Sequence, residues 1–359
     1  MNAACTYLSH LLRPDSRAWR PLLGVYYLTY ACDFRCPYCS DGSGTPYYRL
    51  RSPVLSAERV LALFGIIRRH CDYLVITGGE PLQHPEYAEI LHRLPARRFR
   101  GVILTTNGYH LDQALPAVAR SVTELVVSLQ TMDSTKADLE YGHPGAHQRI
   151  LANLERAASH PGRKYQIIIS SVATPENLAD LRGVCQFAGS CGFRLAVCPQ
   201  LVGVKAHHAL ENNPDYRGFF NFLIAAKQQG ASIQGTVDYL EYLRDLKKFR
   251  CRPFTMLVVA PTGEVFYPCL ELGHFAGNLL AEPNLHRIRQ MGCQRFGSQP
   301  DCGTQCHSAC ALGFARILAK PLSILHEGCL RARTSIMPGG HLSIMQRATG
   351  KVAPTRQHP

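Results

Sequence analysis

The sequence of 359 residues lacks two features that would place it in or across a membrane. It contains no run of about 18 apolar residues, the length that a membrane-spanning helix requires. Residues 1–20 also lack the apolar core and small-residue cleavage site of a secretory signal, because charged side chains interrupt them (Arg13, Asp15, Arg17 and Arg20). We therefore expect no membrane span and a cytoplasmic location. The length favours one large domain and one smaller domain.

Acidic residues are scarce. Against 39 Lys and Arg there are 26 Asp and Glu, which gives a formal net charge of +13. Residues 331–359 contain five Lys or Arg and no acid, and we interpret them as a mobile basic tail. No nucleic-acid-binding motif is present, so nucleic acid is not expected as a partner. From the positive net charge we infer instead a basic surface that attracts an acidic peptide or a phosphorylated substrate.

Cysteine, in contrast, is abundant, with 15 residues. In an exported chain this number would indicate disulfides, but without an export signal it favours metal ligands together with buried thiols. Four cysteines lie in apolar surroundings typical of strands or helices, and we interpret them as small core residues: Cys71, Cys185, Cys191 and Cys198.

Three cysteines follow the first apolar run of the chain. Residues 23–30 are predicted to form a buried strand, and Cys32, Cys36 and Cys39 fall on the loop that leaves it, at CxxxCxxC spacing. Thiolates are the ligands of iron–sulfur clusters, and three of them leave one iron of a [4Fe–4S] cube open to bind a substrate or cofactor. A structural zinc site is the alternative, but zinc usually takes four N or S ligands at paired spacings.

Strands then alternate with helices. Apolar runs predict strands at 23–30, 73–77, 102–105, 125–129, 165–169 and 193–197. Between them we expect helices at 56–70, 85–94, 111–119 and 146–158, and one that begins at Thr174-Pro175-Glu176. Helices are also expected from Asn213 to Gln228 and from Val237 to Phe249. This alternation predicts a parallel α/β sheet with right-handed crossovers, and six units are too few for a full eight-fold barrel.

Further motifs fall at the carboxyl ends of these strands, where sites gather in such sheets. Gly78-Gly79-Glu80-Pro81 follows the second strand, and its glycines would let the backbone approach a ligand, although an ordinary turn is the alternative. Asn107, in Thr106-Asn107-Gly108, could face a ligand or adopt a left-handed turn. Ser128 ends the fourth strand and is followed by Gln130. Ser170 or Ser171 could line the active cavity or be solvated.

A second group of cysteines begins near residue 251. Residues 255–260 and 264–267 flank Pro261-Thr262-Gly263 and are predicted to form a β-hairpin. The hairpin brings Cys251 and Cys269 near each other, and five more cysteines follow: Cys293, Cys302, Cys306, Cys310 and Cys329. By cysteine spacing alone a zinc ribbon is the alternative.

Taken together, these motifs resemble the radical S-adenosylmethionine (SAM) superfamily with a SPASM or twitch-like extension. The resemblance covers roughly residues 22–330 and implies a partial (β/α)6 TIM-like barrel with a small cysteine-rich α+β extension. The implied organisation is an N-terminal segment (1–21), the barrel (22–205), bridging helices (206–250), the extension (251–330) and the tail (331–359). Gln130 stands where the family often has an acid, and the spacing of Cys302, Cys306 and Cys310 departs from the usual run.

The resemblance also implies cofactors and residue roles. Cys32, Cys36 and Cys39 would hold a [4Fe–4S] cluster whose open iron binds SAM. SAM would be positioned by six residues: Tyr38, Gly78, Gly79, Glu80, Asn107 and Ser128. At least one auxiliary [4Fe–4S] cluster would be held by a subset of the seven later cysteines, with Cys251 and Cys269 as the first pair and Cys306 and Cys310 as the next.

The implied activity is reductive cleavage of SAM to a 5′-deoxyadenosyl radical, which abstracts hydrogen from a substrate. The substrate would be a ribosomal peptide or protein side chain that is oxidised, cross-linked or epimerised. A small metabolite such as a sugar, amine or lipid is the alternative. An electron donor such as flavodoxin or ferredoxin is an implied partner. A metal- or redox-sensing cysteine-rich scaffold is the hypothesis from another class, and it predicts bound metal without affinity for SAM.

Overall fold

The computed structural model describes residues 3–12, 19–40, 44–297 and 306–322. Cys302, Cys329 and the basic tail predicted at 331–359 lie outside the described residues. None of the helices in these four ranges combines the length and the apolar character needed to cross a membrane.

A single large sheet forms the centre of the protein. Within the described residues its strand order is β11-β10-β9-β1-β2-β3-β4-β5-β6, and neighbours from β9 to β6 pair in parallel. The six central strands alternate with helices, as the sequence predicts. Their bounds are β1 Leu23–Thr29, β2 Tyr73–Gly78, β3 Gly101–Thr106, β4 Glu124–Ser128, β5 Gln166–Ala173 and β6 Arg194–Pro199. The predicted partial barrel is therefore confirmed.

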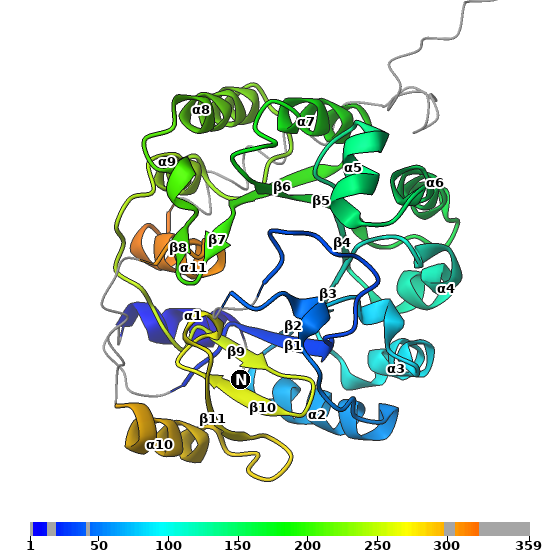
Figure 1. Ribbon diagram of the computed structural model, residues 1–359. Coiled ribbons are helices and arrows are strands. Elements are labelled where there is room, and N and C mark those ends of the chain that lie inside the picture. The colour runs from blue at the N-terminus through cyan, green and yellow to red at the C-terminus, as the bar shows by residue number, and fades with distance from the viewer. Residues whose placement is uncertain (1–2, 13–18, 41–43, 298–305, 323–359) are drawn as a thin grey trace, which may run out of the picture.

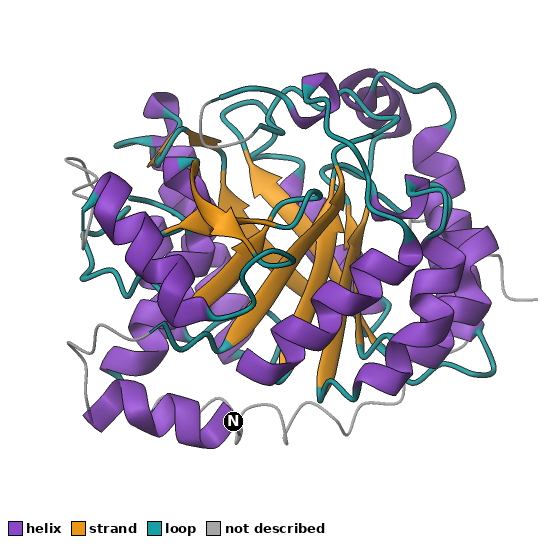
Figure 2. Ribbon diagram, turned by 90° about the horizontal axis from the view of Figure 1, so that it is seen from below, coloured by secondary structure: helices purple, strands orange, loops and turns teal. Residues whose placement is uncertain are grey.

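Helices cover the outside of this sheet, as Figures 1 and 2 show. The helices of the barrel are α2 Ala57–His70, α3 Tyr87–Arg93, α4 Leu111–Ser121, α5 Ser134–Tyr141, α6 Ala146–Ser159 and α7 Leu181–Ser190. The later helices are α8 Pro214–Gln228, α9 Val237–Arg244, α10 Leu285–Phe296 and α11 Ala309–Ala319. A small hairpin, β7 Leu201–Val202 and β8 Lys205–Ala206, follows β6 directly.

Alternate residues of each strand point to opposite faces, which separates the helical core from the inner wall of the barrel. On β1, Tyr26 is fully buried and packs edge-on against Phe64 of α2, with ring centroids 5.6 Å apart. Its neighbour Tyr27 belongs instead to a small separate cluster with Val258 and Phe266. The strand interior is apolar on both faces, and the half-buried polar positions of the inner wall come toward the strand ends.

The cysteine-rich extension continues the barrel sheet. Its strands are β9 Met256–Val259, β10 Glu264–Tyr267 and β11 His274–Asn278. β9 and β10 form the predicted hairpin, and β9 pairs in parallel with β1, with Leu23 opposite Met256 and Tyr26 opposite Val259. The chain therefore returns to its first strand after more than 200 residues. β10 and the strand that leads into the cysteine loop, β1, consequently belong to one sheet.

Two local predictions need correction, and one helix lacks a prediction. The helix predicted to begin at Thr174 begins at Leu181, because the Asn177 side chain accepts from the Thr174 N–H and donates to the Val172 carbonyl, which fixes turns instead. The helix predicted to reach Phe249 ends at Arg244, and Leu246 adopts a left-handed φ of 46°. α5 was not predicted. It begins at Ser134, and the carboxylate of the N-cap residue Asp133 accepts from the N–H groups of Thr135 and Lys136.

The N-terminal segment contacts the extension. α1, Ala3–Leu12, lies against α11, where the Tyr7 hydroxyl donates to the Ile317 carbonyl at 3.0 Å. Trp19 is buried and its indole N–H donates to the carbonyl of Met256 on β9 at 2.9 Å. Residues at the two ends of the described chain thus stabilise each other.

Candidate metal and cofactor site

The three cysteines of the CxxxCxxC motif lie on the loop after β1, and aromatic packing holds this loop in place. Phe34 is buried and stacks on Tyr141 of α5, with centroids 4.8 Å apart and an interplanar angle of 7°. The Arg35 N–H donates to the Tyr141 carbonyl at 2.8 Å, and the Cys39 N–H donates to the Cys36 carbonyl at 3.2 Å. The loop is therefore anchored at positions between the three cysteines, which stay partly exposed.

The three thiols are close enough to affect one another. Burial raises the pKa of each to about 12, and neighbouring thiols add to the shift: Cys36 acts on Cys32, Cys39 on Cys36, and Cys32 on Cys39. Without a metal these thiols stay protonated, so binding of a metal group must release their protons. Across the described residues, no three His, Cys, Asp or Glu side chains are placed around one point to hold a single ion. A cluster holds each thiolate on a different iron, and this all-thiol set fits it better than it fits zinc.

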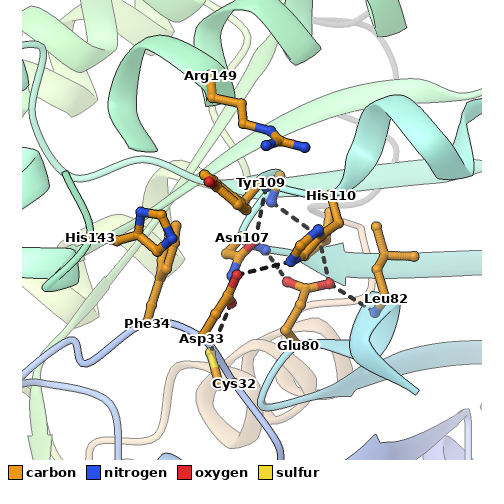
Figure 3. A network of polar contacts seen from close by, with 12 residues as sticks. Cys32, Asp33, Phe34, Glu80, Leu82, Asn107, Tyr109, His110, His143 and Arg149 are labelled. Atoms are coloured by element: carbon orange, nitrogen blue, oxygen red, sulfur yellow. Dashed lines mark hydrogen bonds and ion pairs between the residues drawn. The ribbon is translucent and has the colours of Figure 1, made fainter. Parts of the chain in front are cut away.

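Glu80 of the Gly-Gly-Glu-Pro loop is fully buried and directed into the protein (Figure 3). Its carboxylate accepts from the Leu82 N–H at 2.9 Å, the Thr106 hydroxyl at 2.8 Å and the Asn107 N–H at 2.6 Å. Burial raises the pKa of the Glu80 carboxyl to about 7, although these three donors act in the opposite direction. The side chain therefore joins the loop after β2 to the loop after β3.

Asp33, inside the cysteine motif, extends this network to the metal-site loop (Figure 3). Its carboxylate accepts from the Asn107 side-chain amide at 2.9 Å, contacts His110 Nε2 at 3.0 Å and lies 3.9 Å from the Cys32 thiol. Asn107 thus lies between Asp33 and Glu80. The left-handed turn that was the alternative for Asn107 occurs at Gly108 instead, where φ is +82°.

Aromatic and cationic side chains pack beside this network. In Figure 3 Tyr109 lies between Phe34 and Arg149, with the guanidinium 4.3 Å from the Tyr109 ring centroid. The His143 ring centroid lies 4.5 Å from that of Tyr109 and 5.9 Å from that of Phe34. These contacts fix the loop after β3 against the cysteine loop.

The two glycines of the motif allow the loops to approach each other. A Cβ on Gly78 would lie 2.2 Å from the Thr29 carbonyl oxygen, and one on Gly79 would lie 2.4 Å from that of Ala31. The Gly79 N–H donates to Thr29 and the Glu80 N–H to Ala31, both at 2.8 Å. In this structure the backbone of the two glycines closely approaches the loop after β1. Any contact of this motif with SAM would have to come from its backbone, since the Glu80 carboxylate is occupied.

The remaining predicted cofactor residues lie on the cysteine loop and the inner wall. Tyr38 is half-buried, burial raises its pKa well above the usual value, and its side chain contacts the Cys36 thiol. Ser128 is half-buried and sits in register with Ser170 of β5. Gln130 is buried and its side-chain oxygen accepts from the Val172 N–H at 2.7 Å, so it has a structural contact.

In the extension, the structure brings some of the predicted cysteines together. Burial raises the pKa of the Cys269 thiol, and Glu271 and then Cys251 add to the shift. Cys293 lies on α10 near Tyr267. Cys306 accepts from the Ser308 N–H at 3.3 Å, four residues before Cys310 on α11. The expected proximity of Cys251 and Cys269 is therefore seen.

Sequence reasoning missed Cys198. Cys71 and Cys185 are buried, as a core assignment requires, whereas Cys191 and Cys198 are only partly buried. Burial raises the pKa of the Cys310 thiol to about 12, and Glu271 and then Cys198 add to it, which places Cys198 near a predicted metal ligand. The alternation of side chains along β6 could have indicated this position. Leu195 and Val197 lie on the face that packs in the core, so Cys198 lies on the opposite face.

Comparisons with known proteins agree with this geometry. The family model described as the radical SAM superfamily matches residues 26–188. Molybdenum cofactor biosynthesis protein 1 of Mus musculus is 31% identical over 133 residues, covering 36% of this chain and 21% of that protein. GTP 3′,8-cyclase of Actinobacillus pleuropneumoniae serotype 5b (strain L20) is 31% identical over 144 residues, covering 39% and 42%. The chain thus spans less than half the length of these curated relatives.

Solved structures share the fold over a longer part of the chain. The SAM-bound structure of SuiB from Streptococcus suis has a TM-score of 0.60 at 19% identity and covers 79% of this chain and 68% of that chain. The native anSMEcpe structure with bound AdoMet has a TM-score of 0.57 at 17% identity and covers 86% and 100%. At these identities the likeness concerns the fold.

Proposed function

The barrel of this chain, residues 26–188, belongs to the radical SAM superfamily, and from that premise we propose that the protein cleaves SAM reductively and oxidises a substrate by hydrogen abstraction. A [4Fe–4S] cluster would supply the electron that cleaves SAM to methionine and a 5′-deoxyadenosyl radical. The protein's own part is to hold the cluster and SAM, orient the substrate and exclude water.

One observation carries this proposal: hydrogen bonds join the cysteine loop to the loops after β2 and β3 at one edge of the sheet. Asp33 comes from the first loop, Glu80 from the second and Asn107 from the third. A site of three loops fixed to one another in this way can hold a cofactor between them without reorganisation. A core of apolar residues would not require this buried acidic network.

The residues then take distinct parts. Cys32, Cys36 and Cys39 hold the cluster. We assign Glu80 and Asn107 to the positioning of loops, because their hydrogen-bonding atoms already contact the protein. Direct contact with SAM falls to five groups: the Tyr38 side chain, the backbone of Gly78 and Gly79, the backbone near Asn107, and the Ser128 hydroxyl.

The extension would hold at least one auxiliary [4Fe–4S] cluster. Cys251 lies near enough to Cys269 to affect it, and Glu271 affects both Cys269 and Cys310. Cysteine thiolates are the ligands that an iron–sulfur cluster takes. Such a cluster could accept the electron that a substrate radical loses on the way to product, or bind substrate by an open iron.

For the substrate we propose a ribosomal peptide or protein side chain. Support comes from the fold, which matches SuiB over most of this chain, including a structure described as bound to the precursor peptide SuiA. A small metabolite is the second candidate, and the printed activity of the curated relatives, GTP 3′,8-cyclase, favours it. The implied electron donor is a small redox protein such as flavodoxin or ferredoxin.

The test is SAM cleavage by anaerobically reconstituted protein. With dithionite and SAM it should release 5′-deoxyadenosine, while a variant with Cys32→Ala, Cys36→Ala and Cys39→Ala should release none. Cys185→Ala, which removes a buried thiol on α7, is the matched control and should retain activity. Cluster-loaded wild-type protein that released none, with or without substrate, would overturn the proposal.

Equilibrium binding of SAM separates this function from the metal- or redox-sensing scaffold. The scaffold predicts bound iron without affinity for SAM. The joined loops after β2 and β3 favour the enzyme, because a sensor needs only the cysteine loop.

A further inference from the structure

A short helical turn, η1 Tyr47–Arg49, lies beside the cysteine loop. Its first residue packs against β1: the Tyr47 ring centroid lies 5.7 Å from that of Tyr27, and the two hydroxyls are 3.2 Å apart. An antiparallel bridge between Ser40 and Pro46 joins the turn to the end of the cysteine loop. The turn is therefore fixed at the carboxyl end of β1, beside the loop that would hold the first cluster.

Three arginines gather around the next residue of this turn, Tyr48. The guanidinium carbons of Arg35 and Arg49 lie 4.8 and 5.7 Å from the Tyr48 ring centroid. Arg51 donates to the Tyr48 carbonyl at 3.0 Å. All three arginines are exposed, while Tyr48 is half-buried. Arg35, Arg49 and Arg51, together with Tyr48, thus form one surface, which we call the arginine patch.

The positive charges of the arginine patch are not neutralised by ion pairs. Other exposed arginines pair with acids, as Arg93 does with Glu89 at 2.6 Å. Within the part of the chain that the structure describes, Arg35, Arg49 and Arg51 form no ion pair with an acid. Their contacts are to backbone carbonyls and to an aromatic ring, which leave the charge in place. The patch therefore presents a positive potential that attracts an acidic partner.

One member of the arginine patch belongs to the cysteine loop itself. The Arg35 guanidinium donates to the Cys32 carbonyl at 2.9 Å and to the Phe34 carbonyl at 3.1 Å, and the next residue is Cys36. Glu140 of α5 is an acid near this side of the loop, since its charge acts on Cys36. It can offset at most one of the three positive charges. A partner bound to the patch would therefore lie directly against the loop that holds the first cluster.

We propose that the arginine patch is the docking surface for the electron donor, an acidic redox protein that reduces the first cluster. This inference rests on the proposed function and deepens it by naming where the donor binds. Acidic side chains around the donor's redox centre would be attracted and oriented by the three cations. Tyrosine and arginine are also enriched at protein interfaces. In the step itself the donor loses one electron and the cluster gains it, and no bond forms or breaks.

The test compares two sources of electrons for SAM cleavage by the reconstituted full chain without substrate. One source is excess dithionite, which needs no docking surface. The other is a flavodoxin of net negative charge, kept reduced by NADPH and flavodoxin reductase, at a concentration where reduction limits the rate. In the double variant Arg49→Glu, Arg51→Glu, flavodoxin-driven release of 5′-deoxyadenosine should fall about 10-fold or more at low salt, because electrostatic steering raises association rates by about 10–10³. Dithionite-driven release should equal that of wild type.

The double variant Arg69→Glu, Arg120→Glu is the matched control. These exposed arginines lie in the last turns of α2 and α4, at the opposite end of the barrel strands, and the change in net charge is the same. Both sources of electrons should drive this control at the wild-type rate. The difference between the two double variants should also shrink when ionic strength rises from about 0.01 M to about 1 M, since the Debye length falls from about 30 Å to about 3 Å.

Several outcomes would overturn the inference. One is an unchanged flavodoxin-driven rate in the patch variant, which is also the result expected if the patch serves an acidic peptide substrate, because none is present. A second is an equal loss with both sources of electrons, which would assign the arginines to the fold. A third is wild-type protein that dithionite drives and flavodoxin does not. If the Glu variant fails to fold, Arg49→Gln, Arg51→Gln makes the same comparison. Cluster-loaded wild type that releases no product with dithionite would instead overturn the proposed function, and this inference with it.

Discussion

The buried carboxyl of Glu80 should make the stability of this protein depend on pH near neutrality. Two effects oppose each other at this residue. Removal from water favours the neutral form, whereas two backbone N–H groups and one hydroxyl favour the ionised form. Burial is the larger effect and raises the pKa to about 7, from 4.5 in the unfolded chain.

The sign follows from proton binding. Between these two pKa values the folded protein binds the Glu80 proton and the unfolded chain does not. The stability that Glu80 contributes by this linkage is therefore complete below pH 4.5 and is lost as the pH rises through 7. Integration with pKa values of 7 and 4.5 gives a loss of about 1.3 kcal/mol between pH 6 and pH 8.

The assay compares the wild-type chain with Glu80→Gln, which keeps the shape of the side chain but cannot titrate. Both proteins are prepared without iron and unfolded by urea at several pH values from 6 to 8. The difference in unfolding free energy, wild type minus variant, should fall by about 1.3 kcal/mol across this range. Other groups that titrate here, such as Glu140, whose pKa burial also raises to about 7, are common to both proteins and cancel.

A difference that does not change with pH would refute this reasoning. It would mean that the three donors outweigh burial and keep Glu80 ionised throughout. The absolute difference is not diagnostic, because the amide of Gln would also face the Asn107 N–H, donor against donor. Only its dependence on pH reports the protonation of Glu80.

Two further predictions concern the metal sites. The variant with Cys32, Cys36 and Cys39 replaced by Ala should retain about four irons and four sulfides per chain after reconstitution, which is the stoichiometry of one remaining cube. A variant with no iron and no cluster absorbance would mean that the later cysteines are zinc ligands or bare thiols. His110→Phe removes the 3.0 Å contact to Asp33, worth about 0.5–1.5 kcal/mol, and should speed loss of the first cluster to a chelator by roughly 2–10-fold. His92→Phe, on the exposed side of α3, is its control, and equal rates in the two variants would exclude a role for the Asp33–His110 contact.

The sequence predicts those features of the fold that depend on local pattern. Apolar runs bounded by capping residues locate all six barrel strands, and parallel pairing then brings the loops after β1, β2 and β3 to one edge. This is why the cysteine motif, Glu80 and Asn107 could be assigned to one site before any geometry was known. The family model matches residues 26–188, which contain these motifs, while the role of each residue stays a prediction.

What the sequence does not predict depends on contacts between distant segments. Nothing local to Met256 indicates that β9 pairs with β1, because strand pairing depends on the whole fold. The direction of the Glu80 side chain is a similar case, since its three donors come from two loops. Cys198 was assigned to the core from its apolar neighbours, and only the position of α11 reveals a nearby thiol.

The two serines of β5 offer a test that separates structural groups from ligand-facing groups on one strand. Ser171 is fully buried, and its hydroxyl donates to the Leu129 carbonyl at 2.6 Å, whereas Ser170 is half-buried on the inner wall beside Ser128. Ser171→Ala should therefore lower the unfolding free energy by about 1 kcal/mol and leave the SAM dissociation constant unchanged. Ser170→Ala should have little effect on stability and weaken SAM or substrate binding by about 2–10-fold, the value of one neutral hydrogen bond. Calorimetric binding and urea unfolding of both variants measure these effects. If Ser170→Ala altered only stability, the inner wall near Ser128 would not form part of the binding site.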